Sequence, residues 1–184
     1  MPVVKTSKEE ILKKAFRVFL EKGYYHTSVS DLSRACNIEK PHFYYYFKNK
    51  QDLMISILRF VRIWAKKNLF AYAYNETLEP RVRLERVLNQ IEKIHTQGYW
   101  GCIFSNTALE TANNDDAFLP VLKIYFDEWL DCLKTIFSLK YDNETAENLA
   151  LGFFEGLNGT LLMVKVYRDY SYLKRFRDKQ LNLL

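Results

Sequence analysis

The sequence predicts an all-α protein in which a small N-terminal helical domain precedes a larger C-terminal one. Apolar residues recur with a period near 3.6 in several long stretches, and capping residues, prolines and glycines separate these stretches. Charge divides the chain similarly: residues 1–67 carry 14 Lys and Arg against 6 Asp and Glu, a net charge of +8, whereas residues 68–184 carry 13 against 16, a net charge of −3. A basic N-terminal part followed by a mildly acidic remainder is typical of a nucleic-acid-binding domain followed by a second domain, because phosphate contacts require clustered Lys and Arg.

The first helix is expected to run from about Lys8 to Lys22. Ser7 and Glu10 form a capping-box pattern at its start, and Gly23 is a stop signal at its end. The side expected to face inward carries Ile11, Leu12, Ala15, Phe16 and Phe19.

Residues 28–52, SVSDLSRACNIEKPHFYYYFKNKQD, predict two short helices joined by a tight turn. Ser28 can cap the first of them, with Asp31 as its reciprocal partner. Asn37 tolerates the left-handed backbone conformation that a sharp turn requires. The inward residues of this helix are expected to be Val29, Leu32 and Ala35.

The second short helix is expected to begin at about Lys40. Pro41 suits a first turn, where its missing N–H removes no helical hydrogen bond, and Phe43 and Phe47 are one turn apart, so both can face inward. The residues left facing outward are His42, Tyr45 and Tyr46.

An outward face of His and Tyr is unusual, since exposed helix surfaces are usually rich in Glu, Lys, Gln and Arg. It suits a DNA groove, where hydroxyls and an imidazole can bond phosphates or base edges and flat rings can contact thymine methyls. The alternative is that Tyr44, Tyr45 and Tyr46 merely pack against other helices.

The run KPHFYYYFKNKQDL, preceded by TSVSDLSRACNI, resembles the DNA-binding domain of the TetR family of bacterial transcriptional regulators. The resemblance implies that the two short helices form a helix-turn-helix that binds double-stranded operator DNA, and that Lys50, opening the fourth helix, contacts a backbone phosphate. The other positions that it implies touch DNA are Ser28, Lys40, Pro41, His42, Tyr44, Tyr45 and Tyr46. The sequence departs from the family pattern at Asn37, where Gly is common, and at Glu39, where a small capping residue is common.

A physical argument also connects Lys50 with phosphate. Asn49 can cap the fourth helix, with Asp52 in its first turn, which puts a cation at the positive end of the helix. A phosphate reverses the sign of that interaction, because the helix N-terminus and the ammonium then bind the same oxygens. The alternative is an ordinary solvated surface lysine.

We expect the fourth helix to extend over about residues 50–74 and so to link a DNA-binding domain, residues 1–50, to a regulatory and dimerisation domain, residues 51–184. A further helix is expected to open at Pro80 and to end at Gly98, followed by a segment with two aromatic residues, a thiol and glycines. Such a segment could line a cavity for a small apolar or aromatic effector, or it could be a filled corner of the core. The candidate effector-binding residues are Phe60, Trp64, His95, Tyr99, Trp100, Cys102, Phe104, Asn106, Tyr125 and Trp129.

The last two long helices, expected at about residues 117–139 and 144–170, are apolar on more than one side. The resemblance implies that such a pair forms a four-helix bundle in a homodimer, whereas the alternative is a buried helical hairpin. The candidate interface residues are Phe153, Gly156, Leu157 and Thr160. The tail, residues 171–184, is either a further helix or a frayed end.

Other classes of protein are disfavoured. Three scattered cysteines and three scattered histidines form no metal or catalytic spacing, so neither an enzyme nor a metal cofactor is expected. The start MPVVKTSKEE is polar, and no stretch is expected to approach the ~20 apolar residues of a membrane span, which indicates a cytoplasmic protein without a membrane partner. The leading hypothesis is a ligand-responsive, DNA-binding transcriptional regulator, and specifically a repressor that binds a palindromic operator as a homodimer. The alternative is a DNA-binding dimer whose C-terminal domain binds a protein.

Overall fold

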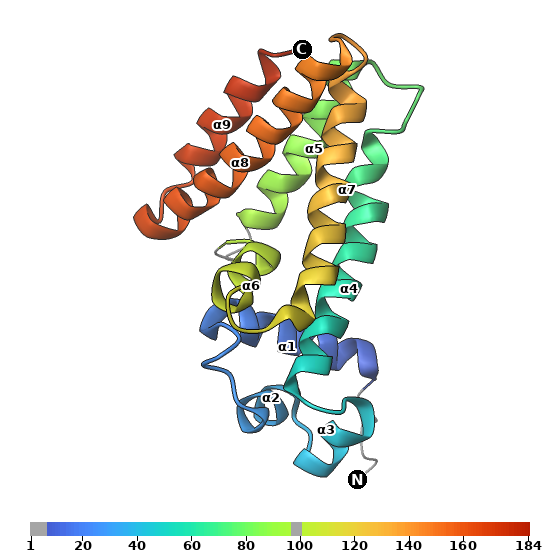
Figure 1. Cartoon of the computed structure of the whole chain (residues 1–184). Helices are drawn as coiled ribbons and strands as arrows, with labels where there is room; N and C mark the ends of the chain where they lie inside the picture. Colours follow the sequence, from blue (N-terminus) through green and yellow to red (C-terminus); the bar gives the residue numbers. More distant parts are fainter. Residues whose placement is uncertain (1–6, 97–100) are drawn as a thin grey trace. The chain divides into compact units, whose positions relative to one another are not determined.

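The computed structural model describes residues 7–96 and 101–184. Within these ranges all regular structure is helical, which confirms the predicted all-α class (Figure 1). The α-helices are α1 (Lys8–Lys22), α2 (Val29–Cys36), α3 (Lys40–Tyr46), α4 (Lys50–Asn68), α5 (Pro80–His95), α6 (Ile103–Thr111), α7 (Leu119–Phe137), α8 (Asn143–Tyr167) and α9 (Ser171–Leu181). Two short 3-10 helices, η1 (Phe70–Tyr72) and η2 (Asp116–Phe118), precede α5 and α7 respectively.

The chain forms two compact units. The first comprises Met1–Val61 and Ile103–Leu122, and the second comprises Arg62–Cys102 and Lys123–Leu184. A segment from the middle of the chain, with α6 and η2, therefore belongs to the same unit as the N-terminal helices.

The core of the first unit is built from the inward faces of its short helices. Capping boxes begin α1 at Ser7 and α2 at Ser28, and α1 ends at Gly23, whose φ of 80° favours glycine. The fully or almost fully buried side chains in this core are Ile11, Ala15, Phe19, Leu32, Cys36, Phe43, Phe47, Leu53 and Ile57. In α2 the inward residues are Leu32, Ser33 and Cys36, whereas Ala35, which was expected to face inward, is exposed.

The second unit is centred on aromatic packing. The Trp129 ring lies 5.0 Å from the Phe70 ring in an edge-to-face arrangement and 5.9 Å from the Phe154 ring. On α9, Phe176 packs edge-to-face on Phe153 of α8 at 5.0 Å, and α9 also contacts α5. The tail is therefore a helix, and the alternative of a frayed end is wrong.

Several predicted helix ends differ from the observed ones. The fourth helix was expected to reach Tyr74, but it ends at Asn68, and Phe70 is then buried in the 3-10 turn that follows. Arg83 fixes this turn, because its buried guanidinium donates to the carbonyls of Ala73 and Leu78 at 2.9 and 2.8 Å. The apolar period continues beyond Asn68 because these residues enter the core, not because the helix continues.

Candidate nucleic-acid interface

The turn between α2 and α3 has the predicted left-handed residue. Asn37 adopts φ 55° and ψ 49°, and the Ile38 amide donates to the Ser33 carbonyl at 3.0 Å, which closes the turn. Helix α3 then begins at Lys40 with Pro41 in its first turn. Glu39 occupies the N-cap position without a side-chain capping bond, as its departure from the family pattern suggested. The sequence therefore predicted this local geometry correctly.

Helix α3 presents one buried face and one aromatic face. Phe43 and Phe47 are 0% and 1% exposed and anchor the helix, whereas Tyr44 and Tyr45 are 55% and 80% exposed. Lys40 and Pro41 are also exposed, and His42 and Tyr46 are half-buried. Six neighbouring residues thus offer hydroxyls, an imidazole, an ammonium and ring faces on a short helix whose other side is fixed in the core.

The rings on the outer face of α3 contact one another. His42 stacks on Tyr46 with ring centroids 5.3 Å apart and an interplanar angle of 28°, and Tyr45 meets Tyr46 edge-to-face at 5.0 Å. Packed rings lose little side-chain entropy when they contact a ligand. The face is therefore partly preorganised for contact with a groove.

Ser28 is committed to its helix cap. Its hydroxyl accepts from the Asp31 amide at 3.1 Å and donates to the Asp31 carboxylate at 2.6 Å. The bond from the Ser28 hydroxyl, with further bonds from the Ser28 amide at 3.0 Å and from Lys22 at 3.1 Å, holds the pKa of the Asp31 carboxylate far below its ordinary value. Since a hydroxyl has only one donor, a phosphate contact by the Ser28 side chain would compete with the cap.

Lys50 opens α4 as predicted, and Asn49 caps the helix by accepting from the Asp52 amide at 2.8 Å. The Lys50 ammonium already has partners within the protein. It donates to the Tyr24 carbonyl at 2.8 Å and lies 4.3 Å from the centroid of the Tyr24 ring. Burial lowers the pKa of Lys50, and the Glu110 carboxylate opposes this effect. Sequence reasoning missed Tyr24 and Glu110, because no local pattern connects either residue with Lys50.

The candidate effector residues are distributed over the chain. Phe60, Phe104 and Asn106 belong to the first unit, and Trp64, His95, Cys102, Tyr125 and Trp129 belong to the second. Tyr99 and Trp100 lie outside the described residues. Tyr125 and Trp129 are 6% and 4% exposed, and burial raises the pKa of Tyr125, with a smaller contribution from Cys102. Trp64 is 38% exposed.

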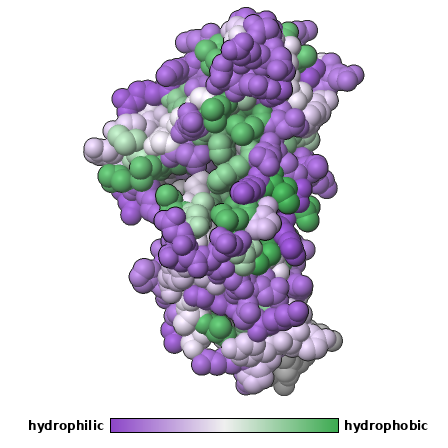
Figure 2. Space-filling view, viewed as in Figure 1, coloured by the Kyte–Doolittle hydropathy of each residue, from purple (hydrophilic) through white to green (hydrophobic). Residues whose placement is uncertain are grey.

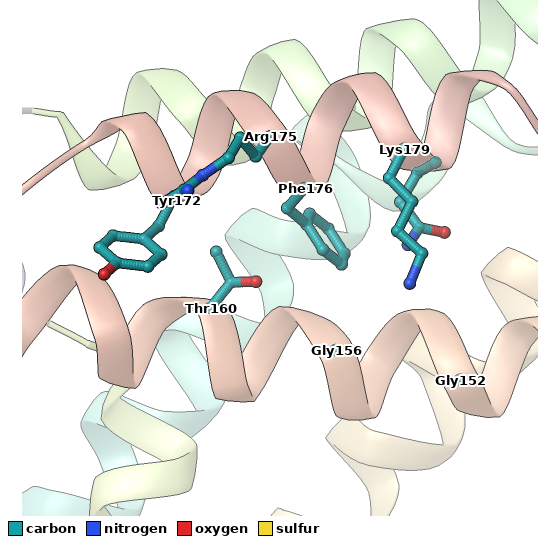
Figure 3. A pocket seen from close by; sticks show the side chains of 8 residues that line it. Gly152, Gly156, Thr160, Tyr172, Arg175, Phe176 and Lys179 are labelled. Carbon is teal, nitrogen blue, oxygen red and sulfur yellow. The ribbon is translucent and has the colours of Figure 1, made fainter.

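The candidate interface residues divide into two kinds. Phe153 and Leu157 are 1% and 4% exposed, so they belong to the protomer's own core. Gly156 and Thr160 instead line a groove of about 310 Å³ between α8 and α9. In this groove Tyr172, Phe176 and Lys179 extend from α9 toward α8 (Figure 3).

Taken together, the left-handed turn, the anchored α3 and its aromatic outer face define a helix-turn-helix DNA-binding regulator. A model of bacterial regulatory proteins of the tetR family matches residues 11–57, and a model of the C-terminal domain of LmrA/YxaF-like transcriptional regulators matches residues 80–179. The chain belongs to the TetR family, whose members are transcriptional regulators and not enzymes.

Relatives and solved structures agree with this assignment. The chain is 27% identical over 176 residues to an HTH-type transcriptional regulator in the lacX 3′ region of Lactococcus lactis subsp. lactis, a match that covers 93% of this chain and 89% of the relative. It is 24% identical to the HTH-type transcriptional repressor DhaR of Mycobacterium sp. (strain GP1), with 92% and 87% covered. A TetR transcriptional regulator from Legionella pneumophila shares the fold, with a TM-score of 0.88, 23% identity, and 98% and 97% of the two chains covered.

Proposed function

We propose that the protein is a ligand-responsive repressor that acts in the cytoplasm and binds a palindromic operator as a homodimer. In this proposal residues 1–50 form the DNA-binding domain, and residues 51–184 form the regulatory and dimerisation domain. The observation that carries the proposal is the outer face of α3. Tyr45 on this face is 80% exposed, whereas Phe43 and Phe47 on the opposite face are buried and anchor the helix. The similarity to a repressor, DhaR, favours repression over activation.

A second copy of the chain accounts best for the surface of α8. Leu151, Leu162 and Val166 are 46%, 59% and 63% exposed and recur on one face of the helix. Added Cβ atoms at Gly152 and Gly159 would meet nothing within 4 Å, so a second helix has room to approach closely. Apolar residues are visible at the surface over the C-terminal part of α8, at the left of the view (Figure 2). We therefore propose that this exposed stripe, rather than Phe153 and Leu157, meets the partner.

A membrane is the competing occupant of this surface. By length and composition α8 is apolar enough to cross a membrane, and 28% of its apolar window is buried. The expectation that no stretch could span a membrane therefore fails for α8, because glycines interrupt the apolar residues without making the helix polar. We favour the second copy, because the exposed Glu155 lies on the stripe between Leu151 and Leu162. Water can remain around a charged side chain in a protein interface, whereas a bilayer core holds no water for it.

We further propose that an apolar or aromatic effector binds in the second unit near Trp64, His95, Cys102, Tyr125 and Trp129 and lowers the affinity for DNA. The alternative is that the C-terminal domain binds a protein partner in place of a small effector. The tight ring packing of Trp129 on Phe70 and Phe154 favours this alternative, because these rings fill the proposed effector site. An effector at this place must open that cluster. Linkage limits its action, because a hundredfold loss of DNA affinity requires about 2.7 kcal/mol of preferential binding to the non-binding state.

Selection of duplexes from a random-sequence library tests the proposed function. We expect the enriched duplexes to contain two inverted half-sites whose centres are about one helical turn, or a small multiple of it, apart, because two α3 helices must reach successive major-groove faces. The Tyr45→Ala variant is the control for base recognition by α3, and we expect it to enrich a less defined half-site. Enrichment of no motif by the unaltered protein would contradict operator binding.

A further inference from the structure

Glu110 of α6 contacts the loop between α1 and α2, although 85 residues separate it from that loop. Its Oε2 accepts from the Tyr25 amide at 3.1 Å. A Cβ atom at Gly23 would lie 2.6 Å from the other carboxylate oxygen, so a larger residue here would push the Glu110 carboxylate out of this position. Gly23 also has φ +80°, a conformation that other residues rarely adopt. The loop is therefore shaped to receive this carboxylate, and all of these residues lie in the first unit.

The same loop holds Lys50. The Tyr24 carbonyl, next to the amide that Glu110 accepts from, receives the Lys50 ammonium at 2.8 Å. The Tyr24 ring is 7% exposed and packs edge-to-face on Phe118 at 4.9 Å, so the loop is fixed on a second side by η2. Gln51, next to Lys50, also donates to the Asp115 carboxylate at 2.7 Å. The start of α4 and the loop thus depend on the segment 103–122.

We infer that Glu110 is a positioning residue for DNA binding. Its carboxylate fixes the Tyr24–Tyr25 backbone, and the Tyr24 carbonyl in turn holds the Lys50 ammonium beside the N-terminus of α4. A cation and helix amides that are held together in advance bind a phosphate without a further ordering cost. The inference rests on the proposed phosphate contact of Lys50 and adds that this contact requires a residue of α6.

The opposite role for Glu110 is competition. A carboxylate near Lys50 carries the same sign of charge as a phosphate, so its removal could strengthen DNA binding. Replacement by Gln separates the two roles, because the amide oxygen of Gln still accepts from the Tyr25 amide whereas the charge is lost. Positioning predicts that Gln preserves binding and Ala does not. Competition predicts that both replacements tighten binding.

Fluorescence anisotropy with the selected operator duplex and with a random duplex tests the inference. We expect Glu110→Ala to weaken binding to both duplexes by roughly three- to tenfold, which is the range for loss of one ordinary hydrogen bond, because Glu110 acts on the phosphate only through the loop. Glu110→Gln should stay within about twofold of the unaltered protein, and Leu109→Ala, at the neighbouring position that is 84% exposed, should have no effect. Exchange of the Tyr25 amide proton, followed by NMR, should be faster in Glu110→Ala only. Unchanged binding in Glu110→Ala, or tighter binding in both Glu110 variants, would overturn the inference.

Two further variants separate this inference from the proposed function. In Glu110→Ala combined with Lys50→Ala, we expect the weakening of Lys50→Ala alone, because Glu110 acts through Lys50. Gly23→Ala directs a Cβ atom into the carboxylate and should reproduce the loss seen with Glu110→Ala. If Lys50→Ala weakens binding and Glu110→Ala does not, only the inference fails. If Lys50→Ala has no effect, the phosphate contact itself fails.

Discussion

Leu162→Asp will separate the protomers and lower operator affinity about a hundredfold or more. Leu162 is 59% exposed in the protomer, so the substitution leaves the protomer's own core intact. In the proposed dimer the same position is buried against a second α8, where an unpaired carboxylate is costly. Linking two binding units raises the apparent affinity by about 10²–10⁴, and a monomer loses this gain. Sedimentation velocity measures the first effect, and anisotropy with the operator duplex measures the second.

Ile63→Asp is the matched control, because Ile63 is also an exposed apolar residue, at 66%, but lies on α4. We expect this variant to remain dimeric and to bind the operator normally. Phe153→Asp should instead unfold the protomer, since Phe153 is 1% exposed. An unaltered dimer in Leu162→Asp would place the interface elsewhere. Flotation of the unaltered protein with lipid vesicles would identify a membrane as the occupant of the α8 surface.

Lys50→Ala will weaken binding to every duplex alike and flatten its dependence on salt. Each phosphate neutralised by a protein cation contributes about −0.9 to the slope of log K against log salt. Loss of one contact in each of the two DNA-binding domains of the dimer should therefore change the slope by about 1.8. Operator and random duplexes should lose affinity in equal proportion, because phosphates carry no sequence information. Anisotropy titrations at a series of salt concentrations give both quantities.

Lys93→Ala removes the same charge from the exposed surface of α5 and should leave the slope unchanged. If Lys50→Ala and Lys93→Ala have equal slopes, Lys50 is an ordinary surface lysine, which was the alternative drawn from the sequence. If Lys50→Ala reduces operator affinity but not random-duplex affinity, the residue contributes to base recognition instead.

The N-terminal helices could be predicted because their signals are local. The capping boxes at Ser7 and Ser28, the left-handed Asn37 and the first-turn Pro41 each act within about four residues of the chain. The spacing of Phe43 and Phe47 then determined which face of α3 is buried. The outer aromatic face followed by elimination.

The contacts between distant segments could not be predicted in the same way. Helix α8 is apolar on several sides, so its pattern did not show that Phe153 and Leu157 face the protomer's own core whereas Leu162 and Val166 do not. Periodicity identifies an apolar face but not its partner. The bond from the Tyr25 amide to Glu110 joins residues 85 apart and has no periodic signal at all.

The central claim is that the outer face of α3 reads DNA sequence, and the specificity of Tyr45→Ala tests it most directly. The measurement is the ratio of the affinities for the operator duplex and for a random duplex, with Tyr74→Ala, a tyrosine 50% exposed in the second unit, as the control. We expect Tyr45→Ala to lower this ratio by about fivefold or more, consistent with loss of a contact to base edges worth about 1–3 kcal/mol, and Tyr74→Ala to leave it unchanged. An unchanged ratio and unchanged affinities in Tyr45→Ala would contradict the assignment of α3 as the recognition helix.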